Sequence, residues 1–224
     1  MFRTFLFTIG LAVSLSSAAA PRIETGRTLA SIREAMRVDH ARELLGKHYK
    51  KSTLFKQENK LDLQVKIESI VSTKLPKKHK GMKTKISKAI LEEATLHNLD
   101  PMFVAAVIEG ESSFNPDAKG PVGEIGLMQL RSATGKWMAE RIDMKWKGDA
   151  MLKDPVTNIK LGTAYLAWLR EKFDRHGQLY VAAYNMGSTN VRRAVKKSVW
   201  PKDYPRHVMK RYLAYYAPSK AKKL

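Results

Sequence analysis

The sequence contains no cysteine among its 224 residues. Disulfide bonds, cysteine-ligated metal sites and a lipid anchor on cysteine are therefore excluded, and the fold must be stabilised by its apolar core. Regular alternation of apolar and polar residues is nearly absent, so few strands are expected. The sequence also has no glycine-rich phosphate loop and no histidine spacing typical of metal ligands. We therefore expect no metal, no nucleotide and no other cofactor.

Long apolar runs are missing outside the first twenty residues, MFRTFLFTIGLAVSLSSAAA. There Arg3 precedes an apolar run, and a stretch of small residues follows it, which is typical of a secretory signal peptide cleaved within Ser17–Ala20. The run Thr4–Leu15 is too short to cross a bilayer of about 30 Å as a helix. We expect an exported protein, periplasmic or secreted, without a membrane span once the signal is removed.

Negative charge is scarce. Lys and Arg number 41 against 21 Asp and Glu, which gives a formal net charge of +20. Such an excess favours polyanionic partners. The basic residues are spread along the chain without interleaved aromatic residues, so we expect no nucleic acid. Export favours anionic polymers of the cell envelope instead.

Composition divides the chain into four parts. After the signal peptide at 1–20, residues 21–80 are rich in charge with scattered apolar positions, which predicts a basic helical extension or linker with exposed helices and little compact core. The segment Lys74–Lys85 combines a proline, a glycine and clustered lysines, and we place the domain boundary there. Residues 81–217 form the predicted catalytic domain, and 218–224 a basic tail.

The principal domain is predicted to be mainly α-helical. Apolar residues from Ile86 onward recur at steps of three and four. Asp100–Pro101 and Asp154–Pro155 each combine a capping residue with a first-turn proline, so a helix should begin at both places. Gly177 is expected to stop the second of these helices. Further helices are predicted at 178–184, 190–197 and 205–216.

The stretch VIEGESSFNPDAKGPVGEIGLMQL, Val107–Leu130, places three glutamates, Glu109, Glu111 and Glu124, among apolar residues and glycines. Glu111 falls at the far end of the apolar helix that begins at Pro101, because Asn115–Pro116 prevents continuation. The negative end of the helix dipole and apolar neighbours both favour the protonated carboxyl group. A general acid needs that state near neutral pH. From spacing alone, an ordinary surface glutamate is the commoner outcome.

Four ordered blocks make the case for Glu111 stronger: ESSFNP, GLMQL, NIKLGTAYLAWL and AAYNMG. Together they closely resemble the catalytic domain of soluble lytic transglycosylases, relatives of goose-type lysozyme. The resemblance extends over residues 85–216 and excludes residues 21–80. It implies a mainly α, lysozyme-like (goose-type) helical domain.

The resemblance also implies roles for individual residues. Glu111 corresponds to the family's catalytic acid and base, with Ser112 supporting the turn and Gly126 allowing close backbone approach. Glu109 points to another side of the helix and is expected to be structural or to lie at the rim. The expected substrate-binding residues are Glu124, Met128, Gln129, Tyr184 and Asn185. Met128 and Tyr184 are also ordinary core residues by type, which is the alternative for both.

Two positions depart from the family's pattern. Many relatives have serine where this chain has Gly120 and alanine where it has Glu124. Here a serine is lost and an acid is gained close to the predicted cleft. We expect Glu124 to border the cleft, either supporting binding or acting as a second carboxylate.

The function implied is a peptidoglycan lytic transglycosylase that cleaves the β-1,4 bond between N-acetylmuramic acid and N-acetylglucosamine and forms a 1,6-anhydro ring. Its partners would be peptidoglycan glycan strands, and other anionic envelope polymers are candidates. Two alternatives stay open. One is lysozyme-like hydrolysis on the same fold, and the other is a wall-binding protein without catalysis. Oligomeric state is not encoded in any feature of the sequence that we identify.

Overall fold

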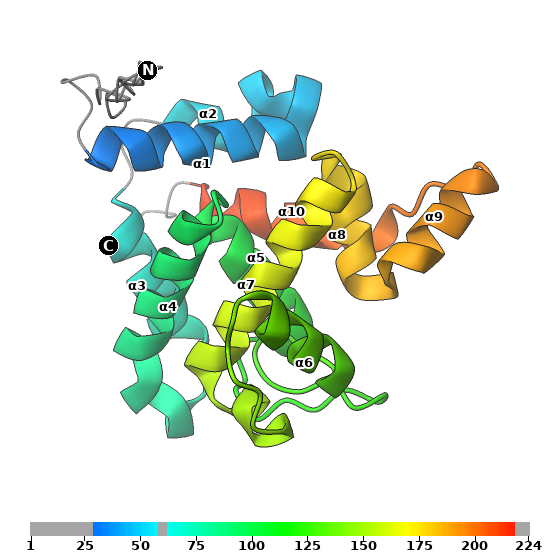
Figure 1. Cartoon of the computed structure of the whole chain (residues 1–224). Coiled ribbons are helices and arrows are strands. Elements are labelled where there is room, and N and C mark those ends of the chain that lie inside the picture. The colour runs from blue at the N-terminus through cyan, green and yellow to red at the C-terminus, as the bar shows by residue number, and fades with distance from the viewer. Residues whose placement is uncertain (1–28, 58–61, 218–224) are drawn as a thin grey trace, which may run out of the picture.

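The computed structural model describes residues 29–57 and 62–217, so the predicted signal peptide and basic tail lie outside the described residues. Helices dominate the described ranges (Figure 1). The α-helices are α1 Leu29–Leu45, α2 Thr53–Gln57, α3 Leu63–Lys74, α4 Lys83–Leu96, α5 Pro101–Ser112, α6 Ser132–Arg141, α7 Pro155–Lys172, α8 Gly177–Met186, α9 Ser188–Lys196 and α10 Asp203–Tyr215. Short 3₁₀ helices are η1 Gly46–Lys51, η2 Lys77–Met82 and η3 Asp149–Lys153. The prediction of a mainly α fold is confirmed.

Helices α5 and α7 begin where the sequence predicts. Asp100 caps α5 by accepting a hydrogen bond from the Met102 amide at 2.9 Å, and Asp154 caps α7 by accepting from the Thr157 amide at 2.7 Å. In each case proline follows the cap, where its missing N–H costs no helical hydrogen bond. The Asp–Pro pairs therefore fix the starts of the two central helices.

Helix α5 is the centre of the core. Every side chain from Pro101 to Ile108 is buried, and the helix packs against α3, α4 and α10. A helix that is apolar on all sides must be covered on all sides. In Figure 1, α3 and α4 lie side by side next to α5, and α10 crosses behind.

The prediction that residues 21–80 form exposed helices with little core is wrong for the part that the structure describes. Their apolar side chains belong to the same buried cluster as α5: Val38, Ala41, Tyr49, Leu54, Ile67, Ile70, Val71 and Leu75. Helices on both sides of the predicted boundary at 80 thus share one core. The high charge of this segment obscured it, because the stripe of apolar residues is narrow.

Charged residues of α1 are also partly internal. Arg170 of α7 makes hydrogen bonds of 2.9 and 2.6 Å with Glu43, and both side chains are largely buried. His40 is fully buried, and burial lowers its pKa well below its ordinary value, so it is neutral. Its Nδ1 accepts from the Asp100 amide at 2.9 Å, which leaves Nε2–H to donate to the Tyr180 hydroxyl, also at 2.9 Å. Glu43 and His40 of α1 therefore make polar contacts inside the protein, with Arg170 and Tyr180.

A second, smaller core lies beyond the first. It contains Leu130, Met138, Ala139, Leu152, Leu161 and Ala164 and supports α6 and the loops around it. Tyr165 and Tyr184 pack against both clusters. The molecule thus has a large and a small apolar cluster, and Tyr184 lies where they meet.

One predicted helix end differs from the structure, and one helix has no predicted counterpart. Gly177 does not stop α7; it begins α8, and α7 ends at Lys172. The chain reverses through Asp174 and Arg175, which both adopt positive φ. Gly177 packs closely on α1, since a Cβ added to it would lie 3.2 Å from the backbone of Glu43 and Leu44. Helix α6 was not predicted, since its sequence lacks a clear apolar stripe.

No helix within 29–57 or 62–217 has the length and apolar character needed to cross a membrane.

Two positions in α3 test whether the extension is part of the core. Ile67 is fully buried, whereas Val65 is 63% exposed. Ile67→Ala should lower the free energy of unfolding by about 2–5 kcal/mol, as expected for a buried aliphatic side chain. Val65→Ala, the matched control, should change it by less than about 0.5 kcal/mol. Urea unfolding measures both, and equal midpoints for Ile67→Ala and wild type would contradict a shared core.

Candidate active site

Glu111 stands in the last turn of α5, as the sequence predicts. The helix ends because Ser113 turns left-handed with φ of 50°, and Phe114 follows with φ of 62° and a fully buried ring. The buried ring anchors this strained turn. The side chain of Glu111 is half-buried, so it has lost much of its hydration and still contacts solvent.

The surroundings of Glu111 raise its pKa above the ordinary value. Burial is the largest cause, and the negative charge of Glu124 adds to it. Two groups act in the opposite direction: the Tyr204 hydroxyl, which donates a hydrogen bond to Glu111 Oε1, and the positive charge of Arg211. The net result favours the protonated acid, in the sense predicted from the helix end and its apolar neighbours.

Tyr204 is the site residue that sequence reasoning missed. It lies in the first turn of α10, 93 positions away from Glu111 along the chain. Burial raises its pKa well above the ordinary value, and the Glu111 charge adds to this, so the phenol keeps its proton and acts as a donor. No local pattern marks such a tyrosine, because only the packing of α10 on α5 brings it there.

Ser112 fastens the end of α5 to the GLMQL loop. Its hydroxyl is 2.8 Å from the Leu127 carbonyl oxygen and 3.1 Å from the Ile108 carbonyl oxygen. Ser112 was predicted to support the turn, and the structure shows that its hydroxyl contacts the Leu127 carbonyl. A serine hydroxyl can donate only one proton, so these two acceptors share it.

The GLMQL loop is also tied to α7 through Asn158, which received no role from the sequence. Its side-chain oxygen accepts from the Met128 amide at 2.7 Å, and its amide donates to the carbonyls of Ile125 and Leu152 at 2.9 Å. Gly126 adopts φ of 79°, and a Cβ there would come within 2.5 Å of Asn158. The sequence predicts a close backbone approach at Gly126. In the structure the backbone of Gly126 approaches Asn158, which holds the GLMQL loop in position.

The Met128 side chain does not line a groove. It is fully buried, and a Cβ added at Gly162 of α7 would meet its sulfur at 2.5 Å. The prediction that this side chain binds substrate is corrected: it is the packing link between the GLMQL loop and α7. What Met128 offers the site is its carbonyl oxygen, which accepts from the Tyr184 hydroxyl at 2.8 Å.

Gln129 is half-buried and adopts φ of 47°. Its side-chain NH₂ donates to the carbonyls of Ala118 and Gly126 at 3.1 and 2.8 Å. Both amide protons are therefore used inside the protein. The side-chain oxygen, directed toward Gly120, is the atom left for a ligand.

Tyr184 and Asn185 end α8. Tyr184 is half-buried and sufficiently close to Glu111 that the Glu111 charge, after burial, is the second cause raising its pKa. Its ring lies 5.5 Å from that of Tyr165. Asn185 is exposed. The structure thus brings Tyr184, Tyr204 and Glu124 to Glu111 and leaves Asn185 at the surface beside them.

The two departures from the family pattern explain each other. A Cβ on Gly120 would lie 2.2 Å from Glu124 Oε2 and 2.9 Å from the Gln129 side-chain oxygen. Glu124 Oε2 instead accepts from the Val122 amide at 3.1 Å. The missing side chain at 120 is what makes room for the additional carboxylate at 124.

Glu109 has a structural role, as expected. Its carboxylate pairs with Lys74 of α3 at 2.5 Å and accepts from the Tyr215 hydroxyl at 2.6 Å. Burial tends to raise its pKa, but the Lys74 and Tyr215 hydrogen bonds outweigh that, so the pKa is lowered. The two glutamates two positions apart on α5 thus have pKa values shifted in opposite directions.

Within residues 29–57 and 62–217, no group of three or more His, Asp or Glu side chains is arranged to hold a metal ion. The arrangement around Glu111 is one carboxyl group with two phenols, Tyr184 and Tyr204, and a second carboxylate, Glu124, whose charge acts on it.

The sequence profile of the transglycosylase SLT domain matches residues 88–206, just over half of the chain. The chain belongs to this family. All six residues predicted for the site lie inside the matched range, whereas α1, α2 and α3 precede it.

Individual relatives agree with this membership. The SLT chain is 40% identical over 116 residues to a transglycosylase of Enterobacteria phage PRD1, covering 51% of this chain and 38% of the phage protein. It is 33% identical over 96 residues to the soluble lytic murein transglycosylase of Salmonella typhimurium, covering 42% and 15%. The chain therefore spans less than half the length of these relatives, 38% of one and 15% of the other.

Solved structures show the same fold. The 70 kDa soluble lytic transglycosylase of Escherichia coli superposes with a TM-score of 0.52 at 28% identity, covering 58% of this chain and 23% of that one. An inactive mutant of the lytic transglycosylase Slt from Pseudomonas aeruginosa gives 0.51 at 28% identity, with the same coverage. A lysozyme-like fold of the transglycosylase type is confirmed.

Tyr204→Phe tests the hydrogen bond to Glu111. Removing the donor destabilises ionised Glu111, so its pKa should rise, and the alkaline limb of the pH–rate profile should move to higher pH. Tyr215→Phe removes the corresponding phenol from Glu109 and serves as control; its profile should match wild type. Turbidity loss of purified sacculi, followed from acid to alkaline pH, gives the profiles. An unmoved limb in Tyr204→Phe would show that the phenol does not act on Glu111.

Glu124→Gln should move the same limb in the opposite direction. Losing a negative charge near Glu111 favours its ionised form, lowers its pKa and shifts the alkaline limb to lower pH. Glutamine keeps an oxygen that can accept from the Val122 amide, so the loop should persist. Unchanged turnover, pH profile and product ratio would together reject a chemical role for Glu124.

Proposed function

We propose that this SLT domain cleaves the β-1,4 bond between N-acetylmuramic acid and N-acetylglucosamine in peptidoglycan, leaving a 1,6-anhydro ring on the muramoyl product. The single observation that carries the proposal is Glu111: a half-buried carboxyl group with raised pKa in the last turn of α5. The sequence resemblance implies that this residue is the family's catalytic acid. The relatives' names, which include soluble lytic murein transglycosylase, support the same substrate class.

In the first step, protonated Glu111 donates its proton to the glycosidic oxygen as the bond to C1 breaks. The positive charge that develops at C1 is stabilised by the substrate's own N-acetyl oxygen. Most glycosidases need two carboxylates, but substrate assistance removes the need for an enzymatic nucleophile. One acid is then sufficient for bond cleavage.

In the second step, the Glu111 carboxylate removes the proton from the muramoyl C6 hydroxyl, and that oxygen attacks C1 to close the ring. Tyr204 is placed to assist this half of the cycle, because its hydroxyl stabilises Glu111 in the ionised form. Burial favours the acid, and Tyr204 limits how far the pKa rises. The same residue can thus serve both steps.

Hydrolysis is the second candidate, favoured by one specific observation. Glu124 supplies a second carboxylate whose charge is felt by Glu111, and relatives with alanine there lack it. A carboxylate beside the acid is what an inverting or retaining glycosidase would use to direct water or attack C1. The product distinguishes the two candidates, since the anhydro form has one water less.

The proposal includes export to the compartment that holds the wall and binding to its glycan strands and other anionic envelope polymers. The net charge of +20 supports attraction to such polymers. Salt should weaken this attraction, because the exposed lysines and arginines are screened over about 8–10 Å at physiological ionic strength.

Glu111→Gln should reduce lysis by about 10²- to 10⁴-fold, the range typical of general acid catalysis. It should not destabilise the fold at pH 7, because a group with raised pKa opposes folding when it is ionised. Glu109→Gln is the matched control on the same helix. Its lowered pKa contributes stability above pH 4.5 that is lost as pH falls, so the substitution should cost roughly 1 kcal/mol and leave lysis intact.

Turbidity assays and urea unfolding measure both variants, and mass spectrometry of the released muropeptides identifies the product. Normal lysis by Glu111→Gln would overturn the assignment. A muramoyl end that carries the additional water would select hydrolysis over ring closure.

A further inference from the structure

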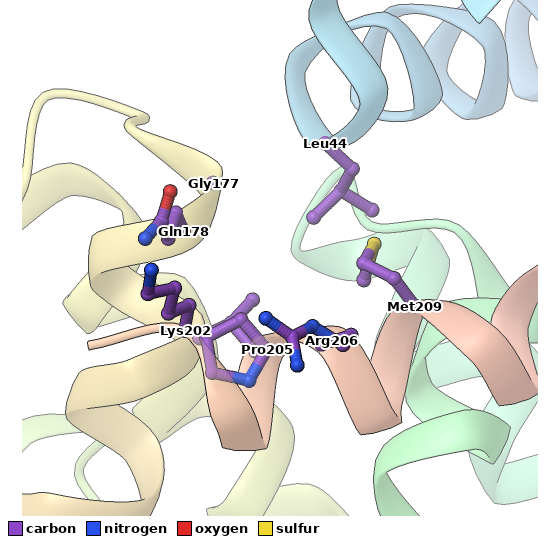
Figure 2. A pocket seen from close by; sticks show the side chains of 8 residues that line it. Leu44, Gly177, Gln178, Lys202, Pro205, Arg206 and Met209 are labelled. Atoms are coloured by element: carbon purple, nitrogen blue, oxygen red, sulfur yellow. The ribbon is translucent and has the colours of Figure 1, made fainter. Parts of the chain in front are cut away.

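A cavity of about 240 Å³ lies between the extension and the SLT domain, apart from the residues around Glu111. Its walls come from the end of α1, the start of α8 and the start of α10. Figure 2 shows Gly177, Gln178 and Lys202 on one side, Leu44 and Met209 on the other, and Pro205 and Arg206 between them. None of the site residues predicted from the sequence lines it.

One wall of the cavity is suited to a negative group. Lys202 and Arg206 line the cavity, and both side chains are positively charged and exposed. At the start of α8, the His176 carbonyl accepts from the amides of Leu179 and Tyr180, and His176 provides no side-chain cap. The amides of Gly177 and Gln178 precede these in the first turn, where the helix offers no partner. Two cationic side chains and the first turn of α8 thus border the same cavity.

The remaining wall is apolar. Leu44, Val181, Pro205 and Met209 contribute it, and Val181 and Pro205 are buried. Inorganic phosphate would leave this surface unused. Sites for drug-sized ligands measure about 300–1,000 Å³, so a cavity of about 240 Å³ suits one or two small residues. The ligand class that fits is a short organic carboxylate with small apolar groups.

We propose that this cavity binds the carboxylate end of a short peptide with small apolar side chains. Resting on the proposed function, we assign its source as the peptide stem carried by the muramoyl residue of peptidoglycan. The planar guanidinium of Arg206 matches a carboxylate in two-point geometry, and Lys202 adds a second charge. Asp203 lies 3.8 Å from Arg206, but both are largely exposed, so this pair competes weakly.

The cavity shares two helices with the site. Pro205 directly follows Tyr204, the donor to Glu111, and Val181 lies one turn before Tyr184 and Asn185. A stem held at the start of α8 and α10 would therefore engage the elements that carry the catalytic surroundings. Leu44 belongs to α1, outside the family match at 88–206, so the extension contributes this one side chain to the apolar wall.

The test is titration of the full mature chain with N-acetyl-D-alanyl-D-alanine, followed by ¹H–¹⁵N NMR. The amides of Gly177 and Gln178 should shift in a saturable manner. The same dipeptide with an amidated C-terminus should give at least fivefold weaker binding, because the charged end is lost. Inorganic phosphate at equal concentration should not displace the dipeptide.

Lys202→Gln and Arg206→Gln should each weaken binding about two- to fivefold, the range of exposed charge pairs. Lys196→Gln removes the same charge from the exposed face of α9, outside the cavity, and should bind like wild type. Both cavity residues are exposed, so the variants should fold, which unfolding midpoints check.

Equal binding of acid and amide, displacement by phosphate, or absence of shifts at Gly177 and Gln178 would overturn the proposal. Glu111→Gln should bind the dipeptide as wild type does. A chain that binds it but never cleaves glycan would refute the proposed function and leave the cavity assignment standing. A chain that cleaves glycan without binding the dipeptide would refute the cavity assignment and leave the proposed function standing.

Discussion

The Glu111 carboxyl group is held partly out of water by an apolar helix, and the rest of the fold is arranged to keep that helix in place. Its first turn is fixed by Asp100, which is fully buried and accepts from the hydroxyls of Tyr212 and Tyr216 at 2.7 and 2.6 Å. Its last turn is fixed by Ser112 and the GLMQL loop. Every side chain from Pro101 to Ile108 is buried, so α5 is packed in place and Glu111 at its end stays partly shielded from water.

Helix α10 links stability to chemistry. Tyr204 in its first turn contacts Glu111, whereas Tyr212 and Tyr216 near its end contact the cap of the same helix α5. Tyr216 also accepts from Arg37 of α1 at 3.1 Å. The segment before the family match therefore supports the position of α10, and through it the hydrogen bond on which the ionised acid depends. This makes the extension part of the working domain.

Local rules in the sequence were sufficient for the helix starts and for the acid. Asp100–Pro101 and Asp154–Pro155 act within four residues, and the apolar run after Pro101 places Glu111 at the end of its helix. The raised pKa of Glu111 comes chiefly from burial, to which Glu124 adds, and that burial depends on tertiary packing. Contacts between residues far apart in the chain could not be predicted from the sequence. Tyr204 reaches Glu111 only through tertiary packing, and the burial of Met128 depends on Gly162 in α7. In α1, Glu43 and His40 suggested an exposed face, but their partners, Arg170 and Tyr180, lie more than 120 positions away.

The central claim is that Glu111 holds its proton above the pH at which an ordinary glutamate loses it. Carbon-13 NMR of chains labelled at the glutamate carboxyl carbon tests this directly, with the Glu111 signal identified by its absence from Glu111→Gln. The account predicts a Glu111 titration midpoint above 4.5 and a Glu109 midpoint below it. A Glu111 midpoint at or below 4.5 in the folded protein would contradict it.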